Sequence, residues 1–240
     1  MIVHQTSRVT LHQGDARDVL ADMATESVDL VVTDPPYGKE WVSSMRQESF
    51  GMLSGDGAGA SDRDAVARII GECVRVTGQN RHLYVFGPSD VFRGQLVTAA
   101  AELVWDKSVM GMGDLAQPWG SAHEPISFVV NKHRHAGEAG RETPPVRMRK
   151  GTVLRHQRPT GTSVRHPSEK PISLISELIE SSSRTGETVL DPFAGSGSTV
   201  VAAVLLGRKA IAVEVDPRYV ELCRTRLVEA ERIRDMLERA

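Results

Sequence analysis

An acid, two prolines and an aromatic residue follow a short apolar run in the first part of the chain. The run covers residues 28–32, and the motif reads Asp34, Pro35, Pro36 and Tyr37. Each proline fixes φ and lacks an N–H, so the pair makes a stiff turn whose carbonyls can face a ligand. The carboxylate and a neighbouring carbonyl are acceptors, and the ring offers a face for stacking. Such a turn suits a flat group that carries an NH2, although an ordinary strand exit would read the same way.

A glycine-rich loop near the other end of the chain is the second candidate. Residues 188–191 predict a short buried strand, 200–206 an apolar helix and 210–216 another strand. Gly195 and Gly197 would let the backbone approach a ligand at the helix N-terminus, and Glu214 could accept hydrogen bonds from ribose hydroxyls. Val200 replaces the third glycine of a dinucleotide fingerprint, and no phosphate-binding lysine follows Gly197. A nucleoside without phosphates therefore fits better than a pyrophosphate.

Three motifs in this order resemble those of the DNA amino-methyltransferases. They are the Asp-Pro-Pro-Tyr turn, the segment His166-Pro167-Ser168-Glu169-Lys170-Pro171, and the run Asp191 to Thr199. The order, with the catalytic motif first and the cofactor loop last, resembles the circularly permuted beta class, and matching segments extend from about residue 11 to residue 227. The resemblance implies a Rossmann-like, doubly wound α/β fold, S-adenosylmethionine as cofactor, double-stranded DNA as partner and, by analogy, a homodimer.

The resemblance also assigns roles to individual residues. The catalytic turn would consist of Asp34, Pro35, Pro36 and Tyr37, with Asp34 accepting from the target amine and Tyr37 stacking on a base rotated out of the duplex. The cofactor would be held by Asp15, His166, Ser168, Lys170, Asp191, Pro192, Phe193, Gly195, Ser196, Gly197 and Glu214. Asp15 would touch the adenine of the cofactor, and Lys170 its carboxylate. Helix N-caps are the alternative roles for Asp15 and Ser168.

Basic charge is concentrated in one segment of a chain whose formal net charge is −2. Residues 132–165 hold nine Lys and Arg and two acids, whereas the remainder holds 20 basic and 29 acidic residues. A solvated loop would explain this composition, but the resemblance implies a target-recognition insertion in which basic side chains meet phosphates and base edges. The DNA-binding candidates are Arg134, Arg141, Arg147, Arg149, Lys150, Arg155 and Arg158.

The remaining segments predict scaffold. Residues 1–131 and 166–240 would form one methyltransferase domain around the basic insertion, with helical stripes at 66–74, 91–99, 172–179 and 220–237 and strands at 9–11, 82–87 and 103–105. The alternation of strands and helices predicts a mainly parallel sheet. Two cysteines without a pairing pattern favour a reducing cytoplasm, and no signal sequence or membrane span is expected. His133, His135 and His156 have no thiol partners, so no metal is predicted.

The expected activity is transfer of a methyl group to N6 of adenine in DNA. Aspartate at the first motif position is the usual choice of adenine enzymes in the family that this chain resembles, and N4 of cytosine is the alternative target. Two other classes also compete. A nicotinamide oxidoreductase would need the missing third glycine and would leave the Asp34 turn unexplained, and a DNA-binding protein without activity would have lost Asp34.

Overall fold

The structure, a computed structural model, describes residues 1–36, 60–109, 118–131, 150–158 and 169–239, with backbone alone at 60–63 and 99. Its strands are β1 (Ile2–Gln5), β2 (Val9–Gln13), β3 (Val28–Thr33), β4 (Thr77–Phe86), β5 (Val97–Asp106), β6 (His123–Asn131), β7 (Val153–Arg155), β8 (Thr188–Asp191) and β9 (Lys209–Glu214). Its helices are α1 (Ala16–Ala21), α2 (Ala60–Val76), the 3-10 turn η1 (Ser89–Phe92), α3 (Ile172–Ser182), α4 (Ser198–Leu205) and α5 (Pro217–Arg239).

All the described strands join one sheet in the order β1-β2-β9-β8-β3-β4-β6-β5-β7. Strands β1 and β6 run antiparallel to their neighbours, and the remaining pairings are parallel. The predicted Rossmann-like, mainly parallel sheet is therefore confirmed. Strands β8 and β9, the last in the sequence, lie between β2 and β3, so the carboxyl ends of β3 and β8 meet at one edge.

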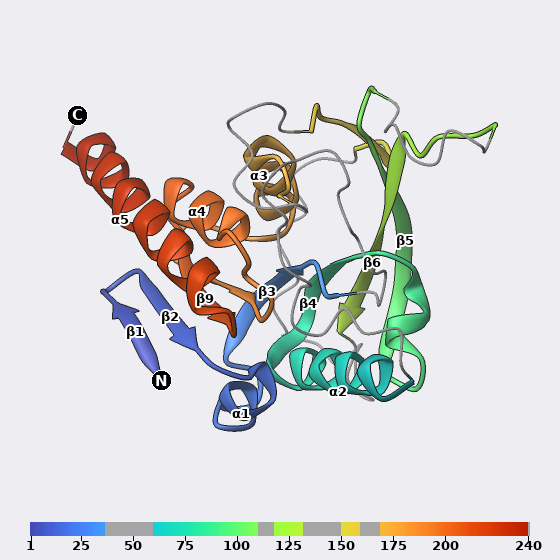
Figure 1. Cartoon of the computed structure of the whole chain (residues 1–240), viewed down its shortest axis with the longest axis horizontal. Coiled ribbons are helices and arrows are strands. Elements are labelled where there is room, and N and C mark those ends of the chain that lie inside the picture. The colour runs from blue at the N-terminus through green and yellow to red at the C-terminus, as the bar shows by residue number, and fades with distance from the viewer. Residues whose placement is uncertain (37–59, 110–117, 132–149, 159–168, 240) are drawn as a thin grey trace, which may run out of the picture.

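Helices cover both faces of this sheet (Figure 1). Alternation along β3 decides which side chain faces which layer. Leu30 and Val32 belong to a core cluster with α3, α4 and α5, whereas Val31 packs in a second cluster with Leu20 of α1 and Ile70 of α2. A strand that is buried on both faces reads as an unbroken apolar run, which is why 28–32 stood out in the sequence.

The helix predicted over residues 91–99 is wrong. The structure has the short turn η1, then Gly94 at φ +81, then β5 from Val97 onward. A residue with positive φ cannot continue an α-helix, and the following alanines pair with β6 instead. Tertiary pairing overrides the helical preference of this alanine-rich stretch.

Part of the predicted insertion belongs to the main sheet. Strand β7 pairs in parallel with β5, and Leu154 is buried in the same core cluster as Leu30. Trp105 of β5 donates its indole N–H to the His156 carbonyl at 2.7 Å, which ties the end of β7 to the sheet. The division at residues 132 and 165 otherwise stays a prediction, because 132–149 and 159–168 lie outside the described residues.

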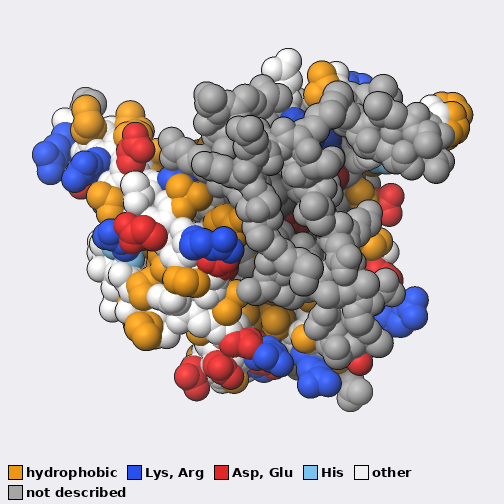
Figure 2. Space-filling view, in the orientation of Figure 1, with side chains coloured by type: hydrophobic (Ala, Val, Ile, Leu, Met, Phe, Trp, Pro, Cys, Tyr) orange, Lys and Arg blue, Asp and Glu red, His pale blue; other side chains and the backbone are white. Residues whose placement is uncertain are grey.

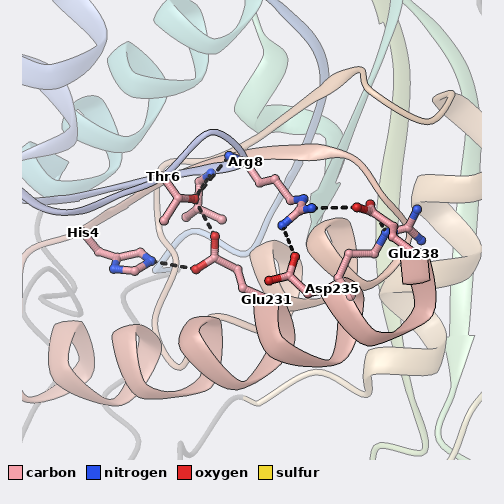
Figure 3. A network of polar contacts seen from close by, with 8 residues as sticks. His4, Thr6, Arg8, Glu231, Asp235 and Glu238 are labelled. Carbon is pink, nitrogen blue, oxygen red and sulfur yellow. Dashed lines mark hydrogen bonds and ion pairs between the residues drawn. The ribbon is translucent and has the colours of Figure 1, made fainter. Parts of the chain in front are cut away.

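The β1–β2 hairpin is fastened to α5 by polar contacts (Figure 3). Glu231 accepts from the Thr6 hydroxyl at 2.5 Å and lies 3.0 Å from His4 Nε2. Arg8 donates to Asp235 at 2.7 Å and to Glu238 at 2.8 Å. These contacts hold the edge of the sheet next to β9.

Candidate active site

The Asp34 turn and the glycine loop lie at the ends of neighbouring strands. Asp34 follows β3 and Asp191 ends β8, and the pairing of Val31 with Leu190 brings the two strand ends side by side. The Thr33 hydroxyl donates to Asp191 Oδ1 at 2.7 Å, so a direct hydrogen bond joins the two ends. Thr33 was not among the predicted site residues. The strand register that reveals it requires the fold.

Asp191 is a buried carboxyl that shapes the loop after β8. It is 3% exposed, and its Oδ1 also accepts the backbone N–H of Phe193 at 3.1 Å. Burial raises the pKa of Asp191 to about 6, against the lowering effect of its hydrogen bonds from Thr33, Thr199 and Phe193. The carboxyl therefore fixes the turn into Pro192 and Phe193.

Asp34 makes a partly buried ion pair with Lys170. The Lys170 ammonium lies 2.5 Å from Asp34 Oδ2 and 3.2 Å from Glu124 Oε2. Burial raises the pKa of the Asp34 carboxyl, and the Lys170 cation opposes that rise. Burial alone would lower the pKa of Lys170, but Asp34 and Glu124 together raise it.

This pairing places Lys170 differently from its predicted role. The sequence reading assigned its ammonium to the cofactor carboxylate, whereas the structure directs it to the two carboxylates of Asp34 and Glu124. Glu124 was not among the predicted site residues. Its position in β6, opposite Trp105 in β5, brings it to the same edge as Asp34.

The glycine loop is shaped by its own packing. Gly197 has φ +85, and a Cβ there would lie 2.6 Å from the Cys223 sulfur of α5. Gly195 has φ +50, and its N–H donates to Glu214 Oε2 at 2.7 Å. Gly197 is thus required by contact with α5 as well as by its backbone conformation.

Glu214 ties this loop to the end of β9. Besides accepting from Gly195, it accepts the N–H of Asp216 at 2.8 Å through Oε1. Burial raises the pKa of Glu214, and the backbone donors oppose that rise. A carboxylate has about four lone-pair directions, so each oxygen retains capacity for another donor such as a ribose hydroxyl.

The segment before α3 is anchored to the glycine loop by Arg226 of α5. The guanidinium lies 3.0 Å from Glu169 Oε1 and donates to the Ser196 carbonyl at 2.8 Å. Sequence reasoning missed Arg226, which looks like an ordinary charge on an amphipathic helix. Helix α3 begins at Ile172 with Pro171 as N-cap, so the alternative role of Ser168 as the cap of this helix is wrong. Ser168 and His166 themselves lie outside the described residues.

Asp15 caps α1, which was the alternative reading of this residue. Its carboxylate accepts the Arg17 N–H at 2.8 Å and pairs with the Arg17 guanidinium. The neighbouring Gly14 donates its N–H to the Glu214 carbonyl at 3.0 Å, so Asp15 lies beside the end of β9. The position is compatible with its predicted contact to the cofactor adenine.

The loop and α4 fit a nucleoside with a polar amino-acid tail. The Ser198 hydroxyl at the start of α4 is buried and has no hydrogen-bond partner in the part of the chain that the structure describes. Buried polar atoms are nearly always paired, so an orphan beside the glycine loop indicates a ligand group. Ser198 and the acceptors of Glu214 together suit the cofactor that the resemblance implies.

Three of the predicted DNA-binding residues are described, and two make ion pairs. Lys150 lies 3.0 Å from Glu177 of α3, and Arg155, whose side chain is 72% exposed, lies 3.4 Å from Asp106. Arg158 is half-buried. Arg134, Arg141, Arg147 and Arg149 lie outside the described residues, as does Tyr37 of the catalytic turn.

No group of three or more His, Cys, Asp or Glu that could hold a metal ion occurs within the described ranges. His156 contacts Ser173 and Glu177, while His133 and His135 lie outside those ranges. Both cysteines, Cys73 and Cys223, are free and buried. None of the described helices is long and apolar enough to cross a membrane.

The described surface is mixed in charge on the face shown in Figure 2. Basic side chains gather near the carboxyl end of α5, and acidic ones gather near α1. Most of the Lys and Arg residues in 132–165 lie outside the described residues, so the described surface shows little of that basic excess.

The fold and this site define a Rossmann-like methyltransferase. Residues 28–225 match the family model of the N6/N4 type described as DNA methylase, and the chain belongs to that family, whose cofactor is S-adenosylmethionine. The DNA adenine methyltransferase YhdJ of Escherichia coli (strain K12) is 28% identical over 254 residues, which cover 91% of this chain and 82% of that protein.

Solved structures show the same fold. TTHA0409 from Thermus thermophilus, complexed with S-adenosyl-L-methionine, has a TM-score of 0.67 at 24% identity, covering 92% of this chain and 93% of that one. The cytosine-N4-specific PvuII DNA methyltransferase has a TM-score of 0.68 at 16% identity, covering 98% and 94%. The family model establishes the family, and the similar proteins include an adenine and a cytosine enzyme.

Proposed function

We propose that the chain methylates N6 of adenine in double-stranded DNA. The observation that carries this proposal is the hydrogen bond between Thr33 and Asp191, which puts the Asp34 turn and the glycine loop at one edge of the sheet. Methyl transfer needs the amine and the donor in line and within contact distance. A motif that binds an amine and a loop that binds a nucleoside serve that purpose only when they are neighbours.

Asp34 would act by accepting a hydrogen bond from an N–H of the target amine. The nitrogen lone pair of an adenine amine is delocalised into the ring, and an acceptor at its hydrogen favours a more pyramidal, more nucleophilic nitrogen. Bound S-adenosylmethionine supplies an electrophilic methyl group on a sulfonium. A quarter of the Asp34 side chain is exposed, so a base could reach it. No covalent intermediate with the protein is required.

The remaining roles are part of the same proposal. Pro35 and Pro36 would stiffen the turn, and Tyr37 would stack on the base after it leaves the duplex. Asp15, Glu214 and the loop from Asp191 to Gly197 would hold the cofactor, with His166 and Ser168 completing its site. The basic residues between 132 and 165 would contact DNA, most of them at phosphates.

N4 of cytosine is the second candidate. The cytosine-N4-specific PvuII DNA methyltransferase has this fold, and both amines present similar hydrogens to a carboxylate. Aspartate at position 34 favours adenine. Labelled methyl transfer to DNA of mixed sequence, followed by digestion to nucleosides, separates the two targets. N6-methyldeoxyadenosine is the expected product, and N4-methyldeoxycytidine in its place would establish the second candidate.

Asp34→Ala tests the assigned acceptor. The variant should lose methyl transfer by a factor of about 100 or more, in the range found when one preorganised partner of a reacting group is removed. Binding of S-adenosylhomocysteine should persist, because the Ala variant leaves the glycine loop intact. Near-full activity would refute the assigned role.

A further inference from the structure

A chain of alternating charges lies behind Asp34. Lys170 contacts both Asp34 and Glu124, and the Lys107 ammonium lies 2.7 Å from the other oxygen of Glu124. Asp34 follows β3, Lys170 precedes α3, and the remaining two come from β6 and the end of β5. Four separate parts of the chain thus contribute to one network.

Aromatic rings surround the central cation of this network. Lys170 Nζ lies 4.9 Å from the ring centroid of Phe86 and 5.9 Å from that of Trp105, and the Lys170 side chain is 9% exposed. A buried ammonium is costly unless anions and ring faces compensate for its lost hydration. An ordinary surface lysine has no such constraint, so this arrangement points to a specific purpose.

The surroundings of Asp34 would otherwise favour its neutral form. Burial raises the pKa of Asp34 and the negative charge of Glu124 raises it further, while Lys170 and Lys107 lower it. Asp191 of β8 is another carboxyl close enough to interact with Asp34. A protonated carboxyl would lose an acceptor site at the oxygen that carries the proton. Lys170 is the cation in direct contact that opposes this outcome.

We propose that Lys170 is a positioning residue, which occupies Oδ2 of Asp34, holds the carboxylate as an anion and leaves Oδ1 for the target amine. Glu124, which is paired with Lys107, contacts the Lys170 ammonium from the other side. Its negative charge limits how strongly Lys170 stabilises the Asp34 carboxylate. The described residues make no hydrogen bond to Asp34 Oδ1. This inference rests on the proposed role of Asp34 as acceptor.

Two substitutions test the network because they should move the pH dependence of methyl transfer in opposite directions. Lys170→Met removes the cation, so the acidic limb of the single-turnover pH–rate profile should move to higher pH by about one unit or more. At pH values below the limb, each unit of this shift should lower the rate roughly tenfold. Glu124→Gln removes a negative charge, so the limb should move to lower pH. Lys170→Arg keeps the cation, so its acidic limb should lie close to that of the wild type.

Matched measurements keep structural damage apart from this effect. Lys209→Met removes an exposed lysine at the amino end of β9, whereas the site lies at the carboxyl ends of the strands. This variant should leave the acidic limb in place. Binding of S-adenosylhomocysteine reports whether each variant folds and holds the cofactor. If Lys170→Met does not fold, Glu124→Gln decides: a limb that stays or rises overturns the proposal.

Other outcomes are equally decisive. Limbs that move in the same direction in both variants, or in neither, overturn the positioning role. A loss of S-adenosylhomocysteine binding with an unmoved limb would return Lys170 to the role of cofactor ligand. If Asp34→Ala retains activity, the proposed function itself fails. If Asp34→Ala is inactive but the acidic limb of Lys170→Met stays in place, only the positioning role of Lys170 fails.

Discussion

Gly197 combines two constraints that usually occur apart. Its φ of +85 is unfavourable for other residues, and a Cβ would approach the Cys223 sulfur to 2.6 Å. Gly186 has nearly the same φ, +87, but nothing lies within 4 Å of its Cβ position. The pair therefore separates backbone strain from crowding within one protein.

Gly197→Ala should destabilise the fold more than Gly186→Ala. Strain costs about 1–2 kcal/mol in both variants, and crowding against α5 adds about 1–3 kcal/mol at position 197 alone. Unfolding in urea, compared at constant m-value, measures the difference. Equal losses of unfolding free energy in both variants would mean that α5 moves away from the added Cβ without a free-energy penalty.

Asp191 predicts a pH dependence of stability. Its pKa rises from an ordinary value of 3.8 to about 6 on folding, so its contribution is fully present below 3.8 and is lost as the pH rises through 6. Between about pH 5 and about pH 8 the wild type should lose about 1 kcal/mol from this group. Asp191→Asn should lack that loss.

The measurement is the difference in unfolding free energy between the two proteins at several pH values without cofactor. Burial lowers the pKa of His82 to about 4, which changes stability in the opposite direction, but His82 is present in both proteins and cancels. Curves that stay parallel across this range would contradict the raised pKa of Asp191.

The sequence predicted which residues form this site better than it predicted how they contact one another. Asp34, Asp191 and the glycines were found because their spacing is local and their motifs are specific. The ion pair of Lys170 with Asp34 joins positions 136 residues apart, and no local pattern reports such a contact. The sequence therefore did not predict the pairing of Lys170 with Asp34.

Among elements, the strands buried on both faces were the easiest to predict. The run at 28–32 became β3, and 188–191 became β8 without change. Strands β1 and β7 have four and three residues and lie at the two edges of the sheet, too short for a periodic signal. The alanines of β5 preferred helix locally and were recruited to the sheet by β6.

The contacts between the first hairpin and α5 predict a stability effect (Figure 3). Glu231→Ala removes the acceptor of the Thr6 hydroxyl and the partner of His4, and should cost about 1 kcal/mol for one exposed and one partly buried hydrogen bond. Glu229→Ala, on an exposed position of the same helix, is the control and should be nearly neutral. Thermal unfolding of both variants measures this. A neutral Glu231→Ala would show that packing alone holds the hairpin.

At the scale of the whole molecule, charge distribution governs the proposed contact with DNA. A protein that is −2 overall can bind DNA only through a local basic surface, and each phosphate contact adds to the salt dependence of affinity. The proposed surface lies in 132–165, of which Arg155 is described and mostly exposed.

Arg155→Ala should weaken DNA binding at all sequences and reduce the slope of log affinity against log salt by about 1 if the side chain meets a phosphate. Arg232→Ala, an exposed position on α5, removes the same charge elsewhere and should leave the slope unchanged. Titrations at several salt concentrations provide the comparison. A slope that changes equally in both variants would remove Arg155 from the proposed surface.

The position of β8 and β9 in the middle of the sheet has a consequence for synthesis on the ribosome. Until residues 188–214 emerge, β2 has no partner on its β9 side, β3 none on its β8 side, and Asp34 faces no glycine loop. A nascent chain therefore carries a gap where the proposed catalytic centre will be. The proposed site is complete only when β8 and β9 fill that gap.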